Sequence, residues 1–250
     1  MLLIINTKIY GDLKRNINNM IKNNETVLLG WCDSGTTDGK FTEGLVGVFV
    51  SGPSNKIKLT SAIRVEGNQI GRQRQILFDH WADNVKTDWL LWVDSDIKID
   101  VQILKKLWEV ADSKERPIIS GTYFVSKETD GSLMIPLPVL FNDVEGDEFK
   151  VSYCHPLPAN VLLKCDSAGM GLVLMHKSIV SKLRKEYPKQ SLFAEQEGVG
   201  AEYISEDVSF FRKVKKVGIP LYAHTGAIAT HIKRFNLDLE YYNLYWNNKA

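Results

Sequence analysis

The sequence predicts an α/β protein with a twisted, mostly parallel sheet and helices on both faces. Through the first half of the 250 residues, short apolar segments alternate with segments whose apolar residues recur every three or four positions. The apolar run at 89–93 is typical of a strand that is buried on both faces. Strands that alternate with helices favour parallel pairing, because each helix carries the chain back to the start of the next strand.

The predicted elements follow one another in a regular order. Strands are expected at 26–32, 56–63, 89–93 and 117–124, with helices between them at 38–50, 70–81 and 101–111. Asp100 precedes the third helix as its N-cap, because its carboxylate can accept from the free backbone N–H groups of the first turn. Later strands are expected at 172–175, 219–222 and 227–230, and Ser205 opens a helix that Gly218 ends.

Composition and charge exclude few classes of protein. The chain is 44% hydrophobic with a net charge of +1, so no global electrostatic attraction to nucleic acid or membrane surfaces is expected. No stretch reaches the ~18 apolar residues that a membrane-spanning helix requires, and a cytoplasmic location is expected. Cys32, Cys154 and Cys165 form no CxxC pair, so reduced thiols are expected rather than disulfides or a zinc site.

Two carboxylates follow the apolar run directly, as Asp94-Ser95-Asp96. Two charges at the end of a fully buried strand are costly unless a cation compensates them. Mg²⁺ and Mn²⁺ prefer hard oxygen ligands, and such a metal can join carboxylates to the negative oxygens of a diphosphate. The triplet therefore predicts a site for a metal and a diphosphate, with two turn-forming carboxylates as the alternative.

Two later features extend this prediction. Ser205-Glu206-Asp207 opens a helix, where carboxylates lie near the positive end of the helix dipole. His231 follows the last expected strand and can reach the same sheet edge to supply a nitrogen ligand. The plainer interpretation is an acidic first turn that stabilises the helix, together with a structural histidine.

The order of these motifs resembles that of a known family. The first strand leads into Gly30-Trp31-Cys32-Asp33-Ser34, and the segment from Asn68 to Arg74 leads into the helix before the acidic triplet. A Gly-x-Gly loop at Gly169 to Gly171, the Glu206-Asp207 pair and His231 complete the series. Over residues 25–234, the chain resembles family-2-like inverting glycosyltransferases of the Rossmann-like GT-A fold, a group with many phage and bacterial members.

The resemblance implies a metal-dependent glycosyltransferase that moves a sugar from a nucleotide-sugar to an acceptor hydroxyl with inversion. Asp207 would be the general base that takes the hydroxyl proton, and Glu206 would orient the acceptor or the helix. Asp96 and His231 would hold Mn²⁺ or Mg²⁺, with Asp94 as a further metal ligand or a contact to the ribose.

The resemblance also implies a set of donor-binding residues. Arg72 or Arg74 would contact the diphosphate, and both stay open because the family usually has Arg-Asn where this chain has Arg72-Gln73. Trp31 would stack on the base and Asp33 would accept a hydrogen bond from the edge of the base, with a core position as the alternative for Trp31. The remaining donor contacts would be Asn68, Ser95, Gly169 and Gly171.

On this interpretation the chain has three parts: an N-terminal extension at 1–24, one catalytic domain at 25–234 and an aromatic tail at 235–250. The domain would have a nucleotide-binding half at 25–125 and an acceptor half at 126–234. Four prolines and an acidic stretch predict an irregular region at 126–160 that would carry acceptor specificity. The extension is expected to hold a short strand and an Asn-rich helix at 12–21.

Two other classes stay open. A metal-dependent nucleotidyltransferase would use the same sheet and metal, but normally has a Gly-rich, basic loop for a triphosphate, which this sequence lacks. A catalytically silent glycan-binding module should have lost Asp96, Asp207 or His231, and all three are present. The acceptor is expected to be a glycan, a lipid-linked sugar or a modified nucleobase, and near-neutral charge disfavours the DNA version. The donor sugar and the oligomeric state stay open.

Overall fold

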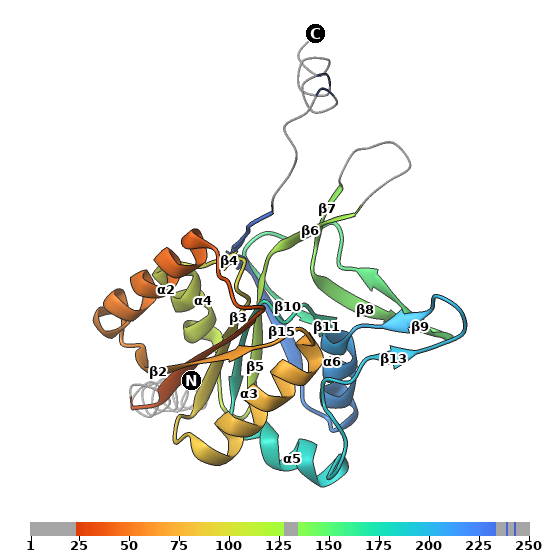
Figure 1. Cartoon of the computed structure of the whole chain (residues 1–250), viewed down its shortest axis with the longest axis horizontal. Helices are drawn as coiled ribbons and strands as arrows, with labels where there is room; N and C mark the ends of the chain where they lie inside the picture. Colours follow the sequence, from red (N-terminus) through yellow and green to blue (C-terminus); the bar gives the residue numbers. More distant parts are fainter. Residues whose placement is uncertain (1–23, 128–134, 234–238, 240–242, 244–250) are drawn as a thin grey trace, which may run out of the picture.

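A seven-stranded sheet forms the centre of this computed structural model, which describes residues 24–127, 135–233, 239 and 243 (Figure 1). The strands lie in the order β10 (Leu162–Cys165), β15 (Leu221–Ile228), β5 (Ile118–Thr122), β12 (Leu172–His176), β3 (Trp89–Val93), β1 (Thr26–Asp33) and β2 (Lys58–Glu66). Strand β1 is parallel to β2 and β3, and β15 is parallel to β5. Strand β12 runs antiparallel to β3 and β5, and β10 runs antiparallel to β15. The prediction of a mostly parallel sheet is confirmed.

Helices cover both faces of this sheet, as predicted (Figure 1). On one face lie α2 (Gly39–Ser51) and α4 (Val101–Val110), and on the other α3 (Ile70–Asn84), α5 (Ile179–Glu186) and α6 (Glu206–Lys216). Strand β3 separates the two cores, because Leu91 packs in the first and Leu90 and Trp92 pack in the second. The strand is therefore buried on both faces.

Side-chain caps explain where two of the helices begin. The Asp38 carboxylate accepts from the backbone N–H of Lys40 at 2.7 Å at the start of α2. Asp100 accepts from the N–H groups of Gln102 and Ile103 at the start of α4, as predicted. A short 3-10 helix, η1 (Pro53–Asn55), connects α2 to β2.

The region at 126–160 is more regular than predicted. The hairpin of β6 (Phe124–Lys127) and β7 (Ile135–Pro138) lies largely within it. It also contains β8 (Leu140–Val144) and β9 (Asp147–Tyr153), which form a small sheet with the later strand β11 (Ser167–Ala168). For 135–153 the prediction of an irregular region was wrong, because Pro136 and Pro138 occur in a strand that pairs on one side only, where a missing N–H is tolerated. Residues 154–160 contain no helix or strand, as predicted. Residues 128–134 lie outside the described residues.

The end of the domain also differs from the prediction. The strands expected at 219–222 and 227–230 are largely one strand, β15, whose residues alternate between buried and half-exposed almost to its end. A short strand β16 (Thr230–His231) then pairs with β4 (Ile97–Lys98), directly after the acidic triplet. The sequence analysis also missed α5, β10 and the hairpin of β13 (Gln196–Glu197) and β14 (Tyr203–Ile204). The expected helix at 12–21 and the tail at 235–250 are not covered, apart from two single tail residues.

The described helices include none with the length and apolar character that crossing a membrane demands.

Candidate active site

The acidic triplet forms a turn at the carboxyl end of β3, the edge of a parallel sheet where ligands usually bind. The backbone N–H of Asp94 donates to the carbonyl of Gly171 at 3.0 Å, which ties the turn to the glycine loop. The carbonyl of Ser95 accepts from the N–H of Asp38 at 3.2 Å, which ties it to the start of α2. The side chains of Asp94 and Asp96 are 28% and 42% exposed, so solvent or a ligand can reach both carboxylates.

Arg74 joins the triplet to the Glu206-Asp207 pair. Its side chain is only 5% exposed, and its guanidinium donates to Glu206 and, at 3.2 Å, to both carboxylate oxygens of Asp94. Burial alone would lower the pKa of Arg74, but the charges of Asp94 and then Glu206 outweigh it and keep the guanidinium ionised. Arg72 is exposed on the same helix. Of the two candidate arginines, Arg74 is therefore the one that lies among the site carboxylates.

Asp96 and His231 meet at the same edge, although 135 residues separate them. His231 Nδ1 lies 2.8 Å from the carbonyl oxygen of Phe124, which can only accept, so Nδ1 carries the proton and donates. In the neutral ring, Nε2 then presents its lone pair to Asp96 Oδ2, 3.1 Å away. Two electron-pair donors that face each other suit a cation, and neighbouring ligands about 2.1 Å from an octahedral ion lie about 3 Å apart.

These two side chains fit a divalent metal that takes its other ligands from elsewhere. Within the described residues, no group of three or more His, Cys, Asp or Glu side chains comes together as a metal cage. Mg²⁺ commonly binds through one or two carboxylates, water and substrate phosphates, so Asp96 and His231 can be its protein ligands. Asp94 is the less suitable ligand of the predicted three, because both of its oxygens face Arg74.

Tyr123 connects the histidine to the glycine loop, and the sequence analysis did not single it out. The residue is 6% exposed, and its hydroxyl accepts from the N–H of Gly171 at 3.1 Å. Its ring meets His231 edge-on, with centroids 5.3 Å apart. A Cβ on Gly169 would lie 2.2 Å from the Tyr123 hydroxyl oxygen, and a Cβ on Gly171 would lie 2.8 Å from it. The Gly-x-Gly pattern therefore has a packing reason, since larger residues would displace Tyr123.

Glu206 and Asp207 open α6 but face different surroundings. Glu206 is 8% exposed and pairs with Arg74, whereas Asp207 is half-buried. The Ser205 hydroxyl donates to one oxygen of Asp207, and the N–H of Val208 lies 2.7 Å from that same oxygen. Burial raises the pKa of Tyr123, and the nearby charges of Asp94 and Asp207 add to this, so both carboxylates lie around one tyrosine. Of the pair, Asp207 is the more accessible to an incoming ligand.

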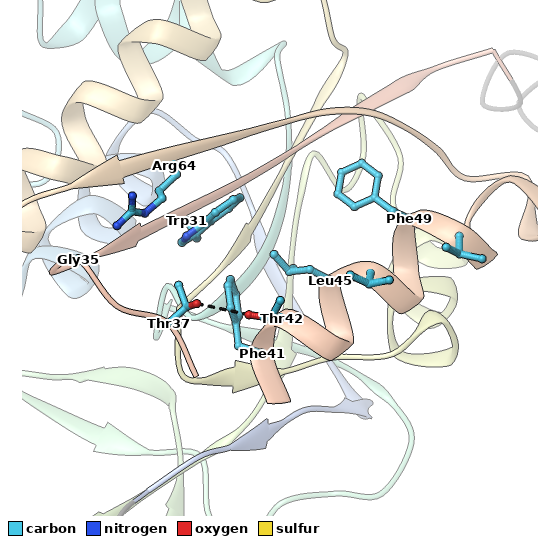
Figure 2. Close-up of a pocket in the computed structure, with 10 residues that line it drawn as sticks. Trp31, Gly35, Thr37, Phe41, Thr42, Leu45, Phe49 and Arg64 are labelled. Carbon is cyan, nitrogen blue, oxygen red and sulfur yellow. Dashed lines mark hydrogen bonds between the residues drawn. The ribbon is translucent and has the colours of Figure 1, made fainter. Parts of the chain in front are cut away.

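A pocket of about 570 Å³ lies between β1, β2 and α2 (Figure 2). Trp31 and Arg64 lie side by side in it, and Phe41 meets the Trp31 ring edge-on at 5.8 Å. Thr37 and Thr42 lie at one end, and the apolar side chains of Leu45 and Phe49 continue the wall along α2 (Figure 2). The pocket thus offers an aromatic face near the triplet, because the loop that contains Thr37 is bonded to Ser95 through Asp38.

The Asp33 carboxylate holds two side chains that line this pocket, Trp31 and Arg64. Its side chain is fully buried, and its carboxylate accepts from Arg64 at 2.6 and 2.7 Å, from the N–H of Gly35 at 2.7 Å and from Trp31 Nε1 at 3.0 Å. The hydrogen bond from Arg64 is the main reason why the pKa of Asp33 is lowered. With these donors in place, Asp33 is suited to holding Trp31 and Arg64 rather than to contacting a base itself. Asn68 is exposed just before α3.

Comparison with known proteins finds structures of similar fold but does not identify a family. No protein-family model and no curated protein matches this sequence. The fold is similar to that of A197 from STIV. The TM-score is 0.53 at 18% identity, over 84% of this chain and 86% of A197. At that identity the similarity concerns the fold alone.

Two glycosyltransferases are also among the structural neighbours. GalNAc-T7, solved with UDP, GalNAc and Mn²⁺, has a TM-score of 0.48 at 9% identity, over 85% of this chain and 44% of that one. A glycosyltransferase involved in glycosylation of the major capsid of PBCV-1 has a TM-score of 0.41 at 11% identity, over 80% and 82% of the two chains.

Proposed function

We propose that the protein is a metal-dependent glycosyltransferase that moves a sugar from a nucleotide-sugar to an acceptor hydroxyl with inversion. The observation that supports this most is the meeting of Asp96 and His231 at the carboxyl edge of the sheet, with the Nε2 lone pair directed at a carboxylate oxygen. Asp207 lies at the same edge and is accessible, which suits a base that acts on the acceptor. No specific observation favours a nucleotidyltransferase.

In the proposed reaction, the acceptor oxygen attacks the anomeric carbon while Asp207 takes the hydroxyl proton. The bond from the anomeric carbon to the diphosphate oxygen breaks, and its electron pair leaves with the diphosphate. When bound, a Mn²⁺ or Mg²⁺ ion neutralises the charge that grows on that leaving group. Arg74 keeps Asp94 in place and leaves Glu206 unable to compete as the base, because Glu206 is buried and paired. Asp94 is then positioned to contact the ribose.

The base of the donor is proposed to lie in the Trp31 pocket. Trp31→Leu is expected to weaken nucleoside diphosphate binding about tenfold, since stacking of a base on an aromatic ring is worth about 1–3 kcal/mol. Ile76 on α3 is 49% exposed and does not line this pocket, so Ile76→Ala is the control with little expected change. Calorimetry with UDP, GDP, CDP and ADP measures both variants. Equal losses in the two variants would place the base elsewhere.

Of a glycan and a DNA acceptor, the glycan fits better. The hairpin of β13 and β14 precedes α6, and Glu197 and Glu202 on it are exposed. Glu195 is also exposed. Burial raises the pKa of Glu206 and the charge of Arg74 lowers it, and Glu195 is close enough to add a smaller rise. These carboxylates would repel the phosphates of a polyanionic acceptor such as DNA, whereas they would not repel an uncharged glycan.

Donor binding with and without Mn²⁺ tests the proposed function. Nucleotide-sugars should bind more tightly with Mn²⁺, and Asp96→Ala should remove the metal-dependent part. Asp100→Ala is the matched control, because Asp100 only caps α4 a few residues away. Binding that ignores both Mn²⁺ and Asp96 would contradict the proposal and favour a glycan-binding module of the same fold.

A further inference from the structure

Lys233 lies at the carboxylate of the proposed metal site, and none of the sequence motifs includes it. Its ammonium nitrogen is 3.1 Å from Asp96 Oδ2, the oxygen that also lies 3.1 Å from His231 Nε2. In the metal-free protein, Lys233 therefore supplies a positive charge at this oxygen.

The backbone holds Lys233 in this place. The N–H of Ile232 donates to the carbonyl of Asp96 at 2.8 Å, and His231 pairs with Ile97 in the ladder between β16 and β4. The side chain itself is 54% exposed, so its ammonium can move into solvent without leaving an uncompensated buried charge. Because the backbone is held in place while the ammonium is exposed on a flexible side chain, the lysine can form and break an ion pair with the carboxylate.

We propose that Lys233 is an exchangeable counter-ion, which holds Asp96 in the metal-free protein and leaves Oδ2 when a divalent cation binds there. This inference rests on the proposed function, since it concerns the same metal site. An ammonium and a divalent cation cannot both lie against one carboxylate oxygen without strong repulsion. Metal binding must therefore break the Lys233–Asp96 pair, which is a small cost because the ammonium is exposed.

The test is Mn²⁺ binding without any nucleotide, measured from the free-ion signal in electron paramagnetic resonance. Lys233→Met is expected to bind Mn²⁺ about three- to tenfold more tightly than the natural protein, with a smaller difference at high salt. Lys233→Arg, which keeps the charge, should bind like the natural protein. Lys98→Met is the matched control, because Lys98 lies on neighbouring β4 and pairs with Glu43 at 2.8 Å, and a change below about twofold is expected.

Unchanged or weaker Mn²⁺ binding in Lys233→Met would overturn the inference, and so would an equal gain in Lys98→Met. Adding Asp96→Asn to Lys233→Met should remove the gain, and a gain that survives would place the cation at another site. Sugar transfer is measured separately on the natural protein. If Mn²⁺ binding follows this pattern but no nucleotide-sugar is consumed, the ion exchange stands and the proposed function fails.

Discussion

Asp207→Asn is expected to reduce sugar transfer by about 10²–10⁴-fold while leaving donor binding unchanged, because the amide cannot take the proton of the acceptor hydroxyl. The substitution keeps the size of the side chain. It also keeps an oxygen for the hydrogen bond from Ser205, so α6 should begin at the same residue. The measurements are kcat for transfer and, by calorimetry, the Kd of the nucleotide-sugar with Mn²⁺.

Glu115→Gln is the matched control for Asp207→Asn. It removes one negative charge from an exposed side chain in the connection between α4 and β5, to which no part of the proposed site is assigned. Transfer by this variant should stay within about twofold of the natural protein, as expected for an exposed carboxylate away from the reaction. If Asp207→Asn keeps most of the kcat, or if it loses donor binding in parallel, Asp207 is not the base.

The sheet could be predicted because each of its main strands has a local signal. The run at 89–93 contains only large apolar residues, and helical periodicity marks the segments before and after it. Strand β7 could not be predicted in this way, since Pro136 and Pro138 normally argue against a strand. Its pairing with β6 depends on tertiary contacts that a local pattern does not contain.

Some contacts of the candidate site could also be predicted from the sequence, and others could not. Asp96 and His231 could be expected at one edge, because both follow strands and strand ends of a parallel sheet gather there. The contact from Arg74 to Glu206 could not be predicted. It joins α3 to α6 across 132 residues, so it depends on how two helices pack. Tyr123 gave no signal beyond its place at a strand end, and Lys233 none at all.

Arg74→Met is expected to lower the free energy of unfolding by about 3–5 kcal/mol, the usual cost of removing one partner from a buried ion pair. The Arg74 side chain is 5% exposed, and its removal leaves the carboxylates of Glu206 and Asp94 without their shared positive charge. Arg72→Met, on the exposed part of the same helix, should change the stability by less than about 0.5 kcal/mol. Urea denaturation of both variants measures the difference in stability and tests whether Arg74, rather than Arg72, forms the stabilising buried ion pair.

The pH dependence of this loss gives a second, sharper test. Burial raises the pKa of Glu206, and Arg74 is the main group that opposes the rise, so removing Arg74 should raise that pKa further. A carboxyl with a raised pKa in the folded state supports folding fully below its unfolded pKa of about 4.3, and this support is lost as pH rises through the folded pKa. The gap in stability between Arg74→Met and the natural protein should therefore be smallest near pH 4 and widest at neutral pH. A gap that is independent of pH would mean that Arg74 contributes packing rather than charge, and that Glu206 does not depend on it for its ionised form.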